Sequence, residues 1–357
     1  MIRVLNVISN LNNAGTEAVV MNYYRHMDRE KVQFDFLVLD TGDGYYEDEI
    51  TQLGGKIYKI PPFSKHPFKN FFKKRKFFKE HKYDVVEVHS PSVLRYGYCK
   101  VAKKGGAKAV IFHVHNFSTQ KGFFVNHARK QIEKYCAQTV TCSQDAAVSV
   151  LGKKADKVIY NAIPCEAYKF NAEKRKELRS FYGIDDNTQV LGHVGRFSEQ
   201  KNHVFLIDAF AEAVKTNGNL KLLLKGFGEL KQQVEERIKA LKLEDKIIIA
   251  EEGHSAAELY NAFDVFVFPS LWEGLGVVMI EAQINGLQCV ASTAVPTIAD
   301  ISDKTVFLPL DKSQWVKTFC DNNLYNRLTP DKNGKFEEYD IVKAAQSRQA
   351  EYLEMVK

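Results

Sequence analysis

Residues 264–284 have the sequence DVFVFPSLWEGLGVVMIEAQI, which predicts a buried parallel strand, a glycine-containing loop and an apolar helix in direct succession. Glycine has no Cβ, so backbone N–H groups around Gly274 and Gly276 can approach a phosphate closely. The first turn of the following helix adds unpaired N–H groups and the positive end of its dipole. This stretch therefore predicts an α/β fold with an anion-binding site at a strand end.

Two glutamates, Glu273 and Glu281, frame this loop. A carboxylate repels phosphate but accepts hydrogen bonds from sugar hydroxyls. Continuous helix would separate the pair by ~12 Å, but the glycines place Glu273 on the loop and Glu281 inside the helix. The two can thus hold different parts of one extended ligand, which favours a nucleotide-sugar site. The alternative is an ordinary strand–loop–helix segment with surface glutamates.

Length and composition indicate two globular α/β domains. The chain has 357 residues, which is long for one core. Its net charge of +6 suits phosphorylated substrates or an anionic membrane face and identifies neither. Six scattered cysteines without a CxxC pair indicate neither a zinc site nor a disulfide framework, and favour a reducing cytosol. Residues 1–9 are too short and too polar for a signal peptide, and no window approaches 18 apolar residues, so we expect a cytoplasmic protein with at most peripheral contact at the inner face of the membrane.

Apolar strand-like runs alternate with amphipathic stretches along nearly the whole chain, which predicts two doubly wound parallel sheets facing a cleft. We expect an N-terminal acceptor domain over residues 1–165, a donor domain over 166–336, and a C-terminal helix, 337–357, that packs back on the first domain. The expected strands are Val4–Ser9, Phe34–Leu39, Ile57–Ile60, Val85–His89, Ala109–His113 and Gln138–Cys142 in the first half, and Val190–Gly195, Leu220–Lys225, Lys246–Ala250, Val265–Pro269, Cys289–Ser292 and Val306–Leu308 in the second.

Ligands of such sheets bind beyond the carboxyl ends of the strands, and the first strand is followed by Gly15 and Thr16 at a helix start. The glycine can admit a phosphate or an acceptor group to the helix N-terminus. The alternative is an ordinary helix start capped by Thr16 or Asn13. Because one glycine is not a GxGxxG fingerprint, a dehydrogenase is disfavoured.

His113, His115 and Asn116 follow the expected fifth strand, where alternation puts both histidines on one side. Metal binding needs a third ligand, and no metal-binding motif supplies one. Core histidines are the alternative to a role in binding a donor-sugar hydroxyl or the reacting groups.

Arg196 and Lys201 flank the loop after the first strand of the second domain. Their cationic groups can jointly neutralise a diphosphate, with a solvated basic loop as the alternative. Gly226 and Gly228 follow the next strand and are a weaker indication of a nearby nucleotide.

Residues 65–82, KHPFKNFFKKRKFFKEHK, mix basic residues with phenylalanines. We expect a helix that packs most of its phenylalanines, on a face with Phe68, Phe71, Phe72 and Phe78, against the sheet. The basic surface that remains suits anionic lipid headgroups. Nucleic acid is disfavoured because no recognised binding module accompanies the patch.

Together the blocks GRFSEQKN, KGFGE and FPSLWEGLGVVMIEAQINGLQCVAS resemble the nucleotide-binding domain of retaining glycosyltransferases of family 4, which have the GT-B fold. The last block is similar to the E-x7-E element of that family. A GGTE-like first loop, an AHSHN-like strand end, an NGID-like hinge and the EAQ-x-x-GL-x-C run resemble the bacterial capsule and exopolysaccharide branch. The resemblance covers nearly the whole chain.

The resemblance implies a role for each matching residue. Glu273 contacts the donor sugar, Glu281 the ribose, and His113 lies beside the reaction centre. The implied donor-binding residues are Gly15, Arg196, Lys201, Gly226, Gly228, Glu273, Gly274, Leu275, Gly276, Val277 and Glu281, with Thr16, His115 and Asn116 on the acceptor side. It also implies transfer with retention, no metal, a uridine diphosphate sugar as donor and a lipid-linked glycan as acceptor.

Four positions depart from the family pattern: Ala14, Val114, Ala162 and Gln288. None removes a charged contact, so activity is expected, and the acceptor contacts are the part affected. The rival hypotheses are a sugar-nucleotide epimerase of the same fold and a non-catalytic nucleotide-sugar-binding subunit.

Overall fold

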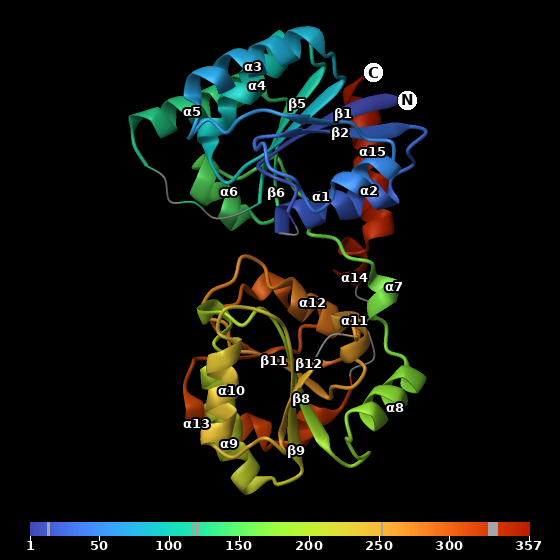
Figure 1. Ribbon diagram of the computed structural model, residues 1–357, viewed down its shortest axis with the longest axis vertical. Helices are drawn as coiled ribbons and strands as arrows, with labels where there is room; N and C mark the ends of the chain where they lie inside the picture. Colours follow the sequence, from blue (N-terminus) through green and yellow to red (C-terminus); the bar gives the residue numbers. More distant parts are fainter. Residues whose placement is uncertain (13–14, 116–117, 119–120, 251–252, 328–334) are drawn as a thin grey trace. The chain divides into compact units, whose positions relative to one another are not determined.

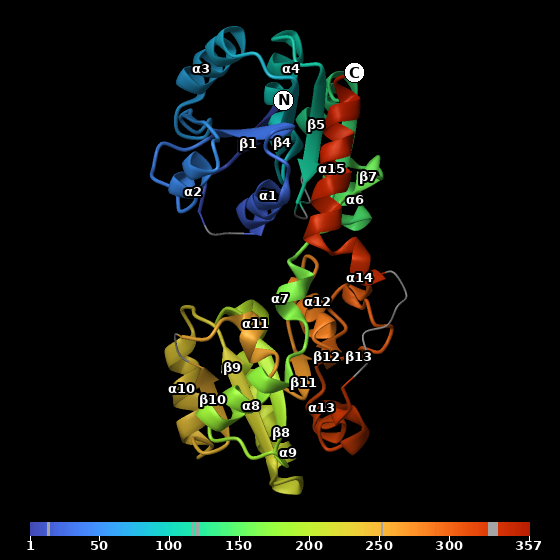
Figure 2. The same ribbon diagram turned by 90° about the vertical axis from the view of Figure 1, so that its right-hand side faces the viewer.

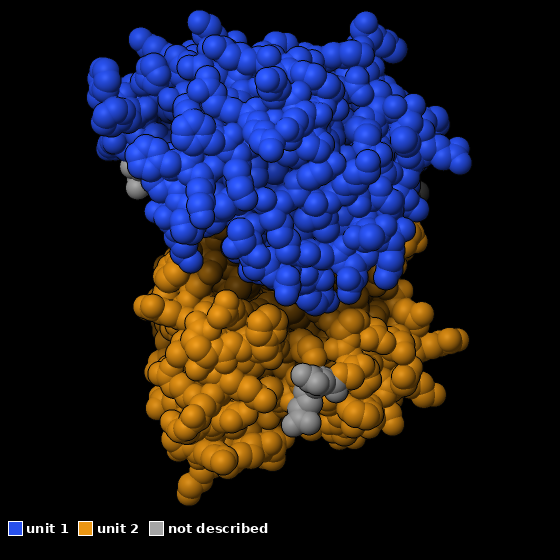
Figure 3. All heavy atoms as spheres, turned by 45° about the horizontal axis from the view of Figure 1, so that its top comes forward, with its two compact units in different colours: residues 1–163, 338–357 blue, residues 164–337 orange. Residues whose placement is uncertain are grey.

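The computed structural model describes residues 1–12, 15–115, 118, 121–250, 253–327 and 335–357. The chain forms two structural units, one of residues 1–163 with 338–357 and the other of residues 164–337 (Figures 1 and 3). Each unit is built on its own parallel sheet with helices on both faces. The predicted fold, two Rossmann-like α/β domains, is confirmed.

Unit 1 has a seven-stranded sheet in the order β3-β2-β1-β4-β5-β6-β7, with every neighbouring pair parallel. The strand order reverses between β1 and β4, which makes the carboxyl ends of these strands a topological switch point. The strands are β1 Ile2–Ile8, β2 Val32–Val38, β3 Ile57–Lys59, β4 Val85–His89, β5 Ala109–Val114, β6 Gln138–Thr141 and β7 Lys157–Val158.

Alternation along these strands supplies two cores, one on each face of the sheet. Leu5 and Val7 of β1 pack with α3, α4, α5 and α6, whereas Val4 and Ile8 pack with α1, α2 and α15 (Figure 1). The helices are α1 Gly15–His26, α2 Glu47–Gln52, α3 Pro67–Glu80, α4 Tyr96–Lys104 with the 3-10 turn Val93–Arg95 before it, α5 Phe123–Tyr135, α6 Gln144–Leu151 and α15 Ile341–Met355.

The last helix, α15, lies beside α1 on unit 1 (Figure 2). The Asp340 side chain caps it by accepting the N–H groups of Val342 and Lys343. Ile341, Ala345 and Tyr352 enter the same core as α1. The end of the chain thus completes the core of unit 1, which its first 163 residues leave open on this face.

The buried face predicted for the helix within residues 65–82 is wrong. Phe68, Phe71 and Phe72 of α3 are exposed, and the buried side chains of this helix are Asn70, Lys74, Phe77 and Phe78. These four follow the i, i+4, i+7, i+8 spacing of one helical face. Asn70 lies on that face because its amide donates to the Pro61 carbonyl and the Tyr98 hydroxyl.

Unit 2 has a six-stranded parallel sheet in the order β10-β9-β8-β11-β12-β13. Its strands are β8 Gln189–Val194, β9 Leu220–Lys225, β10 Ile247–Ala250, β11 Val265–Phe268, β12 Gln288–Ser292 and β13 Val306–Leu308. Its helices are α7 Cys165–Tyr168, α8 Ala172–Phe181, α9 His203–Thr216, α10 Lys231–Ala240, α11 Ala256–Leu259, α12 Val277–Ile284 and α13 Lys312–Phe319; α14, Lys335–Glu338, joins it to unit 1.

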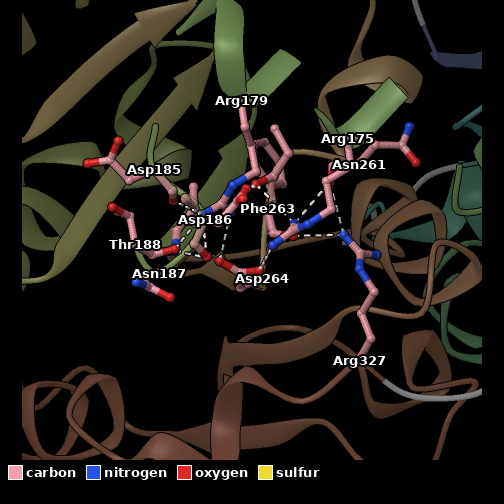
Figure 4. A network of polar contacts seen from close by, with 12 residues as sticks. Arg175, Arg179, Asp185, Asp186, Asn187, Thr188, Asn261, Phe263, Asp264 and Arg327 are labelled. Carbon is pink, nitrogen blue, oxygen red and sulfur yellow. Dashed lines mark hydrogen bonds and ion pairs between the residues drawn. The ribbon is translucent and has the colours of Figure 1, made fainter. Parts of the chain in front are cut away.

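Three arginines gather around the segment before β11 (Figure 4). Arg175 and Arg179 of α8 both pair with Asp264, and Arg327 donates to the backbone carbonyls of Phe263 and Asn285. Burial lowers the pKa of Arg327 to about 9. The cluster fixes the strand that carries the glycine loop.

No helix within the described residues is long and apolar enough to span a membrane.

Candidate functional site

The glycine loop of unit 2 joins β11 to α12. Gly276 immediately precedes α12 with φ +86°, a left-handed conformation that side chains disfavour. A Cβ at this position would lie 3.1 Å from the ring of Phe268. The loop therefore requires glycine here, and the turn presents the first N–H groups of α12, from Val277 onward, to a ligand.

Glu273 of this loop forms an ion pair with Lys201, which lies in the loop between β8 and α9 and was predicted separately. Lys201 Nζ lies 2.6 Å from Glu273 Oε1 and 4.7 Å from the centre of the Phe268 ring. The side chains are only 14% and 8% exposed, so solvent screens the pair weakly. Gln200 holds the two loops together, because its carbonyl accepts the Leu271 N–H and its amide donates to the Trp272 carbonyl, each at 2.8 Å.

Arg196 is much more open than Lys201. It forms a salt bridge of 3.1 Å with Glu229, in which both side chains are more than half exposed. An exposed pair of this kind contributes little to stability, so the guanidinium can exchange Glu229 for a phosphate at little cost.

Gly226 and Gly228 are required by packing between two loops. A Cβ on Gly226 would lie 1.9 Å from the Gly195 carbonyl oxygen, and one on Gly228 would lie 2.5 Å from that of Phe197. A hydrogen bond of 2.8 Å from the Phe197 N–H to the Phe227 carbonyl holds the two loops together. These glycines thus shape the loop that carries Arg196.

Glu281, on α12, accepts two tyrosine hydroxyls. Tyr260 donates at 2.8 Å and Tyr168, from α7, at 3.1 Å. Burial raises the pKa of Glu281, and the two hydroxyls oppose that rise. A carboxylate accepts about four hydrogen bonds, so two acceptor sites of Glu281 are left for other donors. Sequence reasoning missed both tyrosines, since single tyrosines before a loop carry no motif.

In unit 1, α1 begins at Gly15, so Thr16 lies within the first turn of the helix rather than at its cap. A Cβ on Gly15 would meet no atom within 4 Å, so packing does not explain this glycine. Asn13, Ala14 and the predicted acceptor residue Asn116 lie outside the described residues.

A buried polar cluster lies at the carboxyl ends of β1, β4 and β5. Alternation turns Asn6, Glu87, His89 and His113 to the face covered by α1 and α15, because their strand neighbours fill the opposite core. His113 Nδ1 lies 2.7 Å from Glu87 Oε1, and the His113 ring stacks on His115 with centroids 3.9 Å apart. Both predicted histidines therefore belong to one cluster.

The last helix of the chain supplies the counter-charge of this cluster. Arg348 donates to Glu87 Oε2 at 2.8 Å, and the Tyr352 hydroxyl donates to the same oxygen. Burial alone would raise the pKa of Glu87, but the charge of Arg348 and the His113 hydrogen bond hold it well below its usual range. Burial also lowers the pKa of His113, partly offset by Glu87. His113 is thus neutral, with Nδ1–H toward Glu87 and the Nε2 lone pair available.

Comparison with known proteins agrees with this fold. Residues 14–167 match the family model "Glycosyltransferase Family 4", and residues 174–312 match "Glycosyl transferases group 1". The chain belongs to the family 4 glycosyltransferases. Its fold is similar to the crystal structures of Anabaena HepE with UDP and glucose (TM-score 0.76, 19% identity, 99% of this chain and 100% of that one) and of a glycosyltransferase from Rickettsia africae (TM-score 0.80, 16% identity, 100% and 99%).

Three curated relatives match this chain in sequence over most of their length. EpsF of Bacillus subtilis (strain 168), assigned to the glycosyltransferases, is 32% identical over 84% of this chain and 81% of its own. The capsular polysaccharide biosynthesis glycosyltransferase CapH of Staphylococcus aureus is 26% identical over 82% and 81%. The Escherichia coli enzyme UDP-Gal:alpha-D-GlcNAc-diphosphoundecaprenol alpha-1,3-galactosyltransferase is 24% identical over 78% and 76%. The protein is thus a glycosyltransferase with the GT-B fold.

Proposed function

We propose that this protein transfers a sugar from a uridine diphosphate sugar to a hydroxyl of a lipid-linked glycan, with retention at the anomeric carbon, in the synthesis of a bacterial capsule or exopolysaccharide. The observation that carries the proposal is the buried Lys201–Glu273 pair beside the start of α12. This pair puts a cation that can bind a phosphate next to a carboxylate that can accept hydrogen bonds from sugar hydroxyls.

The leaving group is stabilised by fixed charges and dipoles. As the bond from the anomeric carbon to the diphosphate oxygen breaks, negative charge grows on the diphosphate. Lys201, Arg196 and the N–H groups at the start of α12 meet that charge without reorganising, which is often the largest catalytic contribution. These groups take the place of a divalent metal, so transfer proceeds without one.

Sugar and ribose are held by carboxylates. Glu273 accepts hydroxyls of the donor sugar, and Glu281 accepts those of the ribose. The acceptor oxygen then attacks the face that the diphosphate leaves, and the departing phosphate oxygen takes the acceptor's proton. His113, neutral with a free Nε2, accepts a hydrogen bond from a donor-sugar hydroxyl and orients it.

The donor and acceptor classes are supported by relatives. The name of the E. coli relative gives UDP-Gal as donor and a GlcNAc-diphosphoundecaprenol acceptor, and HepE was crystallised with UDP-glucose. CapH supports a role in capsule synthesis. A lipid-linked acceptor also suits α3, whose exposed Phe68 and Phe72 lie among lysines that match an anionic membrane.

The test is transfer from UDP-glucose, UDP-galactose and UDP-N-acetylglucosamine to a synthetic polyprenyl diphosphate sugar, in the presence of EDTA. We expect an α-linked product from one donor, at an undiminished rate. Lys201→Ala should lose ~10²–10³-fold in rate, whereas Lys215→Ala, whose partner Glu212 lies in an exposed i,i+3 pair, should keep it. A β-linked product, or activity that needs manganese, contradicts the proposal.

The two rivals predict other products. An epimerase converts the sugar nucleotide without an acceptor. A non-catalytic subunit is stabilised by UDP against thermal unfolding but turns over no donor with any acceptor.

A further inference from the structure

Three buried histidines converge in unit 1, at the switch point of the sheet. His89 ends β4, His113 is in β5, and His115 follows β5 by one residue. A ring nitrogen of each lies within 4.8 Å of a ring nitrogen of the other two, and each residue is at most 9% exposed. Three imidazole nitrogens at this spacing meet the minimum that a bound transition metal requires.

Two of the three rings are oriented as metal ligands are. His113 Nδ1 lies 2.7 Å from a carboxylate oxygen of Glu87, and His89 Nε2 lies 3.0 Å from the side-chain oxygen of Asn6. A ligating histidine almost always gives its second N–H to a carboxylate or carbonyl oxygen, which fixes its tautomer and ring angle. The opposite nitrogens, Nε2 of His113 and Nδ1 of His89, are then lone-pair donors.

The third ring, that of His115, already contacts the ring of His89. His115 Nε2 lies 2.8 Å from His89 Nδ1, so one proton is shared between two nitrogens. A tetrahedral ion with bonds of about 2.0–2.1 Å separates its ligands by about 3.3 Å. The His89 and His115 nitrogens therefore need to part by about 0.5 Å, and the stacked rings of His113 and His115, with centroids 3.9 Å apart, must also separate. In the same change the His115 proton moves from Nε2 to Nδ1. No net proton is gained or lost in that exchange.

We infer that His89, His113 and His115 form a binding site for a transition metal ion that prefers imidazole, with zinc as the physiological candidate. Neutral imidazoles suit Zn²⁺, Co²⁺, Ni²⁺ and Cu²⁺, whereas Mg²⁺ and Mn²⁺ prefer oxygen ligands. The site is therefore different in kind from a metal on the donor diphosphate.

Two arginines and one carboxylate lie around these histidines. Arg348 opposes a cation, but it is paired with Glu87 at 2.8 Å. Arg95 donates to the His89 carbonyl and the Ser9 hydroxyl, and is the second positive charge nearby. Glu87 is shared between Arg348 and His113, so it offsets only part of the charge that an ion adds.

One consequence rests on the proposed function. An ion on His113 Nε2 occupies the lone pair that orients the donor sugar. Zinc is thus an inhibitor of transfer, and a chelator restores activity.

The binding test needs no substrate. Full-length protein, freed of metal by a chelator and desalted, is titrated with CoCl₂ and then ZnCl₂. We expect the intense visible absorption of tetrahedral Co²⁺, saturating at one ion per chain and abolished by zinc. His89→Gln should lose it. The matched control is His203→Gln, because His193 and His203 form a buried pair with ring centroids 4.7 Å apart, two histidines rather than three.

A spectrum that is absent from the wild type, or unchanged in His89→Gln, overturns the site. If His89→Gln does not fold, X-ray absorption of the zinc-loaded wild type decides, with three imidazole nitrogens at about 2.0 Å expected and an oxygen-only shell contradicting the site. Zinc inhibition of transfer is measured separately. Metal binding without inhibition refutes the role of His113 in transfer and leaves the metal site standing, whereas inactivity with a normal Co²⁺ spectrum refutes only the proposed function.

Discussion

At the scale of single residues, both candidate sites depend on buried groups whose charge is set by one or two neighbours. Glu281 is the example in unit 2, where burial raises the pKa and the hydroxyls of Tyr168 and Tyr260 oppose that rise. Such a carboxylate keeps its charge, and so its strength as an acceptor, only while those donors are present.

Tyr168→Phe is therefore expected to weaken UDP binding about fivefold, since a hydrogen bond to a charged group contributes about 1 kcal/mol or more. The pKa of Glu281 rises further without this donor, so the loss is larger at pH 6 than at pH 8. Isothermal titration at both values measures it. Tyr325→Phe removes a hydroxyl bonded to the Phe319 carbonyl and serves as the control; equal losses in both variants contradict the role of Tyr168.

Arg348→Met tests the charge balance of unit 1. It leaves Glu87 buried without its cation, and we expect unit 1 to lose about 3–5 kcal/mol in free energy of unfolding. Urea unfolding followed by hydrogen exchange of unit 1 peptides measures the loss. The control is Arg25→Met, which breaks an ion pair with Glu49 whose side chains are each 35% exposed, and which should cost less than about 1 kcal/mol.

The pH dependence of the stability of Arg348→Met should have the opposite sign to that of the wild type. In the wild type the folded pKa of Glu87 lies below its ordinary value of 4.5, so its stabilisation is present above pH 4.5 and is lost as pH falls through the folded pKa. Without Arg348, burial raises the pKa of Glu87 in the folded state above its ordinary value. The contribution of Glu87 to stability is then lost as pH rises through this raised pKa. A variant with the wild-type slope would show that Arg348 does not set the charge of Glu87.

At the scale of elements, local sequence predicted what local physics decides. Leu220–Lys225 has the predicted bounds, because short apolar runs between turn residues leave few alternatives for a buried parallel strand. The face of α3 was wrong, because phenylalanines occur on both sides of that helix and burial follows the partners Pro61 and Tyr98 of Asn70. Apolarity alone does not identify the buried side when both sides are aromatic.

The exposed side of α3 carries the prediction that belongs to this scale. Phe68→Ser with Phe72→Ser should reduce sedimentation with vesicles containing anionic lipid by ~10-fold, because each ring contributes buried apolar area at the headgroup boundary. Binding should also fall at high salt. The control is Phe181→Ser, an equally exposed ring in unit 2. Unchanged sedimentation of the double variant contradicts membrane contact through α3.

At the scale of the whole molecule, the candidate site of unit 1 is completed by residues that sequence reasoning could not join. Glu87 and Arg348 are 261 positions apart, and nothing local to α15 marks Arg348 among its other polar residues. The loops of unit 2 that we propose for the donor could be picked out from the sequence because each is a contiguous motif. A cluster assembled from β1, β4, β5 and the last helix has no such motif.

Removal of residues 338–357 should therefore destabilise unit 1 and leave unit 2 folded. The truncated chain loses Arg348, Tyr352 and the core that α15 closes, so unit 1 should unfold, while unit 2 keeps Lys201, Glu273 and Glu281. We expect one calorimetric transition in place of two and UDP affinity within about threefold of the wild type, a difference of under 1 kcal/mol. Full-length Arg348→Met is the intermediate control, with both transitions present and the first at lower temperature. Loss of UDP binding on truncation would mean that the donor site depends on unit 1, because Arg196, Lys201 and Glu281, to which the proposed mechanism gives the diphosphate and the ribose, all lie in unit 2.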